Sequence, residues 1–89
     1  MTATTTVKQV AAYSKRRTAL AILNRSTSIT AYIGNTANVS VNNGFDLPPT
    51  GIIVFSEHFG DDPKIMRSVV TAAGSAELTV LEEYVEGGN

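Results

Sequence analysis

The chain contains no cysteine, no tryptophan and a single histidine among its 89 residues. The lack of cysteine excludes disulfide bonds, thiolate metal sites and cysteine nucleophiles, and it leaves the cellular compartment open. With His58 as the sole imidazole, no site that needs two histidine ligands can form. Because tryptophan is missing, a sugar-binding platform would have to be built from tyrosine.

Charged residues are also scarce, at 17% of the chain, with 7 Lys and Arg against 8 Asp and Glu. No large charged surface is therefore expected, and neither nucleic acid nor an anionic membrane is predicted as a partner. Residues 15–17 (Lys-Arg-Arg) form one basic cluster, while the C-terminal segment is acidic. We interpret these charged residues as ones that protect an aggregation-prone strand. The alternatives are contact with nucleic acid and electrostatic pairing between subunits.

Long apolar segments are absent too, since no run approaches the about 18 residues of a membrane span. The opening residues lack the basic start and apolar core of a secretory signal, so we expect an unprocessed chain without a membrane segment. What the sequence does contain is a series of short apolar or alternating runs separated by turn-forming residues.

The first half of the chain predicts a strand over residues 18–24 and a second over 29–33, joined as a hairpin through residues 25–28. A short helix is the competing interpretation of 18–24, because that run is rich in alanine and leucine. Residues 39–41 predict a minimal strand, and Asn43-Gly44 predicts a type I′ hairpin turn.

The second half opens with a rigid turn at residues 47–51, which contains Pro48 and Pro49. Residues 52–55 are apolar at every position, which predicts a strand covered on both sides, by a second sheet or by a neighbouring subunit, at the centre of the core. Residues 65–71 and 76–82 predict two further strands. In the last one Ala76, Leu78 and Val80 share the buried face.

Six to eight short strands with regular turn signals predict an all-β fold, a small antiparallel β-sandwich or a jelly-roll-like barrel. Residues 1–89 are expected to form one domain. Within it, residues 1–14 are predicted to be an N-terminal arm or an edge strand, and residues 87–89 a flexible tail.

No catalytic motif is present. The sequence has no phosphate-binding loop and no G-x-S-x-G turn around a serine nucleophile. The segment from Glu57 to Asp62 groups the histidine with carboxylates, but it offers too few oxygen ligands for calcium, and we interpret it as a solvated loop. We therefore expect a protein that is not an enzyme and that has no catalytic residue, cofactor or metal.

Four segments of the chain are RTALAILNRS from Arg17, ITAYIG from Ile29, NGFDLPP from Asn43 and AELTVLE from Ala76. Their order and spacing resemble a family of small proteins encoded among the structural genes of tailed phages and related viruses. The similarity extends from about Arg17 to Glu83. The chain has a more apolar stretch at 51–59 and an additional polar loop at 59–64.

This resemblance implies a virion component, such as a capsid decoration, spike-base or minor capsid protein. The expected partners are other virion proteins and further copies of the chain, with a trimer or pentamer preferred. The alternative is a ligand- or glycan-binding module on a virion surface. The residues expected at the interface are Val7, Val10, Tyr13, Arg16 and Arg17.

Overall fold

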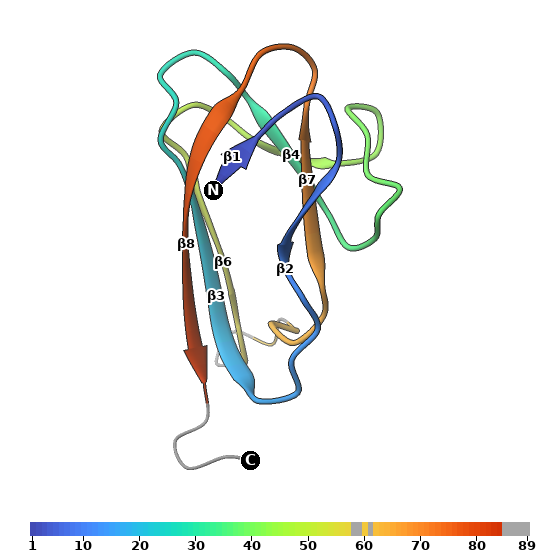
Figure 1. Cartoon of the computed structure of the whole chain (residues 1–89). Helices are drawn as coiled ribbons and strands as arrows, with labels where there is room; N and C mark the ends of the chain where they lie inside the picture. The colour runs from blue at the N-terminus through green and yellow to red at the C-terminus, as the bar shows by residue number, and fades with distance from the viewer. Residues whose placement is uncertain (58–59, 61, 85–89) are drawn as a thin grey trace.

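The computed structural model describes residues 1–57, 60 and 62–84. These residues form eight β-strands in two layers that face each other (Figure 1). The strands are β1 (Thr2–Ala3), β2 (Lys8–Ala11), β3 (Arg17–Asn24), β4 (Ala31–Gly34), β5 (Phe45–Leu47), β6 (Ile52–Ser56), β7 (Arg67–Thr71) and β8 (Ala76–Tyr84).

The strand pairing defines a jelly roll. β1 pairs with β8, β2 with β7, β3 with β6 and β4 with β5, all antiparallel, so the chain resembles one long hairpin folded at β4–β5. The additional pairs β3–β8 and β4–β7 roll this ribbon into two four-stranded sheets. Their strand orders are β1-β8-β3-β6 and β2-β7-β4-β5. The predicted all-β sandwich is thus confirmed, and the competing helix over 18–24 is wrong because that run is β3.

The core lies between the two sheets and is built from alternate residues of each strand. Leu20 and Ile22 of β3 are fully buried, while Ala19, Ala21 and Leu23 lie on the opposite face and are half-buried. β8 alternates in the predicted manner, with Ala76 and Leu78 buried and Val80 packed against the core. The period of two that is visible in the sequence therefore separates core from surface in these strands.

The N-terminal segment contributes an edge strand to each sheet. β1 lies beside β8, and Ala3 is fully buried against the core. The chain then passes to the other sheet, where β2 lies beside β7 (Figure 1). The backbone NH of Thr71 donates to the carbonyl of Thr4 at 2.9 Å, which fixes the crossing. Residues 87–89, expected to form a tail, lie outside the described residues.

The predicted position of the core centre at residues 52–55 is wrong. These residues do form a strand, β6, directly after the predicted turn at 47–51, but β6 is the edge of its sheet and pairs only with β3 among the described strands. Ile52 is 61% exposed and Val54 is 45% exposed. An unbroken apolar run predicts burial on both faces, whereas only Ile53 and Phe55 pack against the core.

The predicted hairpin between residues 18–24 and 29–33 is also wrong, because β3 and β4 belong to different sheets. Asn24, a turn former by residue type, is fully buried at the crossing. Its side-chain amide donates to the carbonyls of Ile29 and Leu47 at 2.8 and 3.0 Å, and its Oδ1 accepts the NH of Ser26 at 3.0 Å. These bonds turn the chain from one layer into the other.

Two further local predictions fail between β4 and β5. Residues 39–41 form no strand, although Val39 is buried. Neither Asn43 nor Gly44 has a positive φ, so the turn is not of type I′. Instead, the NH groups of both residues donate to the carbonyl of Ser40, and Asn43 Oδ1 accepts the NH of Ser40 at 2.8 Å. The connection is thus a compact loop that closes on itself.

Candidate interaction surface

The outer face of the sheet β1-β8-β3-β6 carries a contiguous group of apolar side chains. The register places Val54 of β6 beside Ala21 of β3, and Ala21 beside Leu81 of β8, so these three residues form one row across the sheet. In the next row Ile52 pairs with Leu23. Ile52 and Leu81 are each 61% exposed. We refer to Ala21, Leu23, Ile52, Val54 and Leu81 as the apolar face.

Polar residues border the apolar face along the strands. Ser56, Ala19 and Glu83 form the row on one side, and Thr79 completes the row of Leu23 and Ile52 on the other. Arg25 lies just beyond β3, and its guanidinium approaches Thr79 Oγ1 at 3.5 Å. An apolar centre with a polar border is the usual composition of a protein–protein contact surface.

A pocket of about 330 Å³ opens between the two sheets on the side where β5 and β6 are the edge strands. Phe45 of β5 is 64% exposed at this pocket, and Ile53 and Phe55 of β6 line the facing side. At its base the Arg67 guanidinium carbon lies 3.7 Å from the centroid of the Phe55 ring. Arg67 also donates to Asn35 Oδ1 and to the carbonyl of Asp62, so its charge is held by fixed acceptors.

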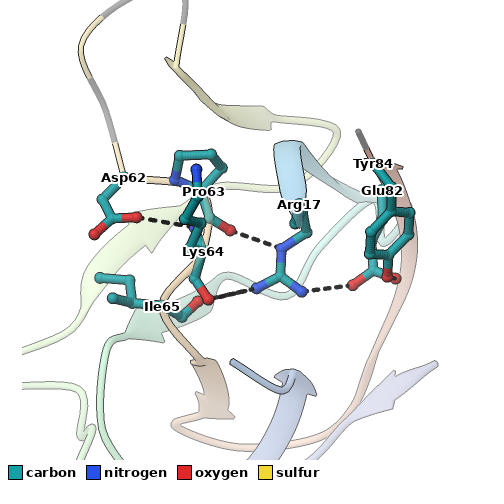
Figure 2. A network of polar contacts seen from close by, with 7 residues as sticks. All are labelled: Arg17, Asp62, Pro63, Lys64, Ile65, Glu82 and Tyr84. Carbon is teal, nitrogen blue, oxygen red and sulfur yellow. Dashed lines mark hydrogen bonds and ion pairs between the residues drawn. The ribbon is translucent and has the colours of Figure 1, made fainter. Parts of the chain in front are cut away.

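Arg17 links two strands and the segment 63–65 within the fold. It is 1% exposed, and its Nε donates to the carbonyl of Pro63 at 2.6 Å. One terminal nitrogen donates to the carbonyls of Lys64 and Ile65 at 3.4 and 3.1 Å, and the other binds Glu82 Oε1 at 3.0 Å (Figure 2). The planar guanidinium thereby joins β3, β8 and the segment that leads into β7.

The five residues expected at an interface are scattered around the N-terminal part of the fold. Tyr13 is 64% exposed and Arg16 is exposed, whereas Val7 is half-buried. Val10 packs against the core on β2, and Arg17 is buried in the network described above. The structure therefore leaves Tyr13 and Arg16 accessible, and it assigns Val10 and Arg17 to the interior.

The charge asymmetry along the chain is partly neutralised within the molecule, because β3, which begins at Arg17, and the acidic β8 are neighbours. Arg17 pairs with Glu82, and the N-terminal amino group lies 3.3 Å from Glu77. The pKa of Glu77 is lowered, mainly by a hydrogen bond from Thr2 Oγ1 at 2.6 Å and secondly by the N-terminal amino group. A hydrogen bond to Glu82 raises the pKa of Tyr84.

The loop expected to be solvated contributes contacts within the fold where it is described. Asp62 Oδ1 accepts the NH of Lys64 at 3.0 Å, and Lys64 forms an ion pair with Glu57. His58 lies outside the described residues. Across the rest of the chain, the described residues contain no group of three or more side chains suited to a metal ion. Nor do they include a helix of the length and apolarity needed to cross a membrane.

Sequence reasoning missed the apolar face because its members come from three separate runs. Alternation along the last strand places Leu81 on its outer side, and this was the available signal, but the alignment of Leu81 with Val54 depends on the order of the strands.

Comparison with protein-family models, with curated proteins and with solved structures found no match.

Proposed function

We propose that this chain is a structural component of a virus particle, a capsid decoration, spike-base or minor capsid protein that self-associates and docks on the particle. The jelly roll is an architecture of viral capsid domains, which supports this proposal at the level of the fold. The observation that carries it is the apolar face, because it supplies a surface for contact with another protein subunit.

The exposure on this face is concentrated in one place. Ile52, Val54 and Leu81 are three of the large hydrophobic residues that the structure leaves exposed, and they occupy adjoining rows of a single sheet. Exposed apolar side chains that occur singly are ordinary, whereas a contiguous patch with a polar rim is typical of a contact surface. Burial of such a patch is the main favourable contribution to protein association.

The test is the composition of purified virus particles from the source of the sequence. Mass spectrometry should detect the chain at a copy number set by the symmetry of the particle, and cryo-electron microscopy should place the sandwich with its apolar face against a neighbour. A particle that lacks the chain, or that carries it with the apolar face directed to solvent, would overturn the proposal.

A second candidate function, ligand or glycan binding on a virion surface, is favoured by the pocket between β5 and β6. The exposed ring of Phe45 can stack on a sugar or another ring, and Asn35 and Asn43 provide amide groups at the pocket wall. Lectin domains also use the jelly roll. A glycan array should then show binding that Phe45→Ala abolishes, and an array without signal would reject glycan binding.

A further inference from the structure

We propose that β6 is the site of self-association, and that two copies of the chain pair their β6 strands antiparallel about a two-fold axis. This inference rests on the proposed self-association and specifies its surface and partner. An open edge strand presents unpaired backbone NH and carbonyl groups, which a strand of another molecule can satisfy.

The four edge strands of the sandwich differ in how they are protected. β1 has two residues, and β5 has three, one of which is Asp46. β2 carries Lys8 and an irregular register between Gln9 and Ala11. Short length, charge and bulges are the features by which natural sheets prevent pairing between edges. β6 has none of these, since its sequence is IIVFS over five regularly paired residues.

The sequence of β6 is complementary to itself when two copies run antiparallel with Val54 at the centre. Val54 then lies opposite Val54 of the second copy, Ile53 opposite Phe55, and Ile52 opposite Ser56. This register keeps outward residues with outward residues. The two apolar faces become continuous across the axis. On the inner side, Ile53 and Phe55, which line the pocket, meet the same residues of the second copy.

Charges around β6 also favour the antiparallel arrangement. Glu57 follows one end of the strand. Antiparallel pairing places the two Glu57 residues at opposite ends of the paired strands. Parallel pairing would instead place Glu57 beside Glu57, which is unfavourable.

Pairing of an edge with itself generates a closed two-fold dimer. The other three edges are protected, so they offer no equivalent partner for a head-to-tail ring. The first assembly unit is then a dimer instead of the trimer or pentamer expected from the sequence, and a larger ring would require a second contact.

The experiment exploits the absence of cysteine from the chain. Val54→Cys places two thiols directly opposite each other across the axis, at a Cβ separation of about 4.5–5.5 Å, which a disulfide can bridge with small adjustments. Ile52→Cys is the matched control. Its thiol lies opposite Ser56, so the two introduced thiols are about four residues apart along the strands, or roughly 13 Å. Mild oxidation should cross-link Val54→Cys much faster than Ile52→Cys.

Sedimentation of the full-length chain at micromolar concentration gives the second readout. The unmodified chain should sediment as a dimer, and Val54→Asp, which opposes two carboxylates at the axis, should sediment as a monomer. Val41→Asp is a control on a residue of similar exposure, 42% against 45%, and should remain dimeric. Leu81→Asp should also remain dimeric, because Leu81 lies two strands from the edge.

Three results would overturn the inference. They are a monomeric unmodified chain, equal cross-linking of the two cysteine variants, and dissociation by Leu81→Asp but not by Val54→Asp. The last result would indicate packing between apolar faces instead of edge pairing. A chain that is monomeric in solution yet present in virus particles would reject β6 pairing alone and leave the proposed function intact.

Discussion

β6 and β7 follow one another along the chain but lie in opposite sheets and in opposite environments. β6 is an edge strand whose outward residues Ile52 and Val54 are exposed, although it carries no charge. β7 lies between β2 and β4, and all five of its residues are buried, including the polar residues Arg67 and Thr71. The more polar of the two strands is therefore the more deeply buried.

The polar residues of β7 are buried at low cost because they have hydrogen-bond partners. Thr71 Oγ1 donates to the carbonyl of Gly74 at 2.8 Å, and Arg67 donates to the carbonyl of Asp62 at 2.6 Å. Buried polar groups in native proteins are ordinarily satisfied in this way. The comparison teaches that the apolar character of a strand does not by itself decide its burial, and that local contacts make polar residues compatible with a buried position.

The same substitution in the two strands should give the largest contrast. Val69→Asp would place an unpaired carboxylate at a site with 0% exposure in β7. The expected cost is several kcal/mol, comparable to the total stability of about 4–13 kcal/mol for a domain of this size, so the variant should be unfolded. Val54→Asp should leave the monomer folded, because the carboxylate would remain in water. Circular dichroism and thermal melting measure both effects.

The contrast is informative only if protein concentration is controlled, since loss of a dimer also lowers the melting temperature. Dilution of the unmodified chain to its monomeric state provides the reference for Val54→Asp. If Val54→Asp is unfolded under those conditions, then β6 is part of the core, and the comparison between the two strands is wrong.

Features set by local sequence could be predicted, and features set by strand order could not. The alternation of Ala76, Leu78 and Val80 predicted the buried face of β8, because it depends on the strand period alone. The exposure of Val54 depends on its place on an outer sheet face that no other described segment covers. The burial of Arg17 depends on three carbonyls about 46–48 residues away along the chain. Neither feature can be identified from the residues that flank these side chains.

The apolar face could be predicted only in pieces. The outward position of Leu81 followed from alternation, but the row that joins it to Val54 requires β3 to lie between β8 and β6. The interface predicted at Val7, Val10, Tyr13, Arg16 and Arg17 stays a prediction, and the fold distributes these residues over β2, β3 and the segments beside them. In a jelly roll a surface is assembled from strands distant in sequence, so contiguous residues are divided between two sheets.

The segment that joins β6 to β7 provides the next test, because Arg17 fastens it to β3. Arg17→Ala should lower the free energy of unfolding by about 3–5 kcal/mol, since it leaves the carbonyls of Pro63 and Ile65 without their donor and Glu82 without its cation. Arg17→Lys keeps the charge but lacks the planar fork, so it should restore only part of the loss. Urea denaturation measures both variants, and equal stability of Arg17→Ala and the unmodified chain would contradict this role.

A smaller effect is expected within β7 itself. Thr71→Val removes the hydroxyl that donates to the Gly74 carbonyl while retaining the shape of the side chain. The expected loss is about 1 kcal/mol, the usual net contribution of one hydrogen bond. A gain in stability for Thr71→Val would show that polar residues in β7 are tolerated and not stabilising.

The smallest effect is expected at β1, the edge opposite β6 in the same sheet. There a hydrogen bond from Thr2 to Glu77 adds to the backbone pairing with β8. The hydrogen bond from Thr2 lowers the pKa of Glu77, so ionised Glu77 stabilises the fold above the ordinary glutamate pKa of about 4.3. That contribution is lost as the pH falls through the lowered pKa. Thr2→Val should raise the pKa of Glu77 toward its ordinary value, as measured by NMR titration of the side-chain carboxyl. Thr5→Val alters an exposed residue of the same segment and should leave this pKa unchanged. An unchanged pKa in Thr2→Val would mean that β1 is not held to β8 by this contact.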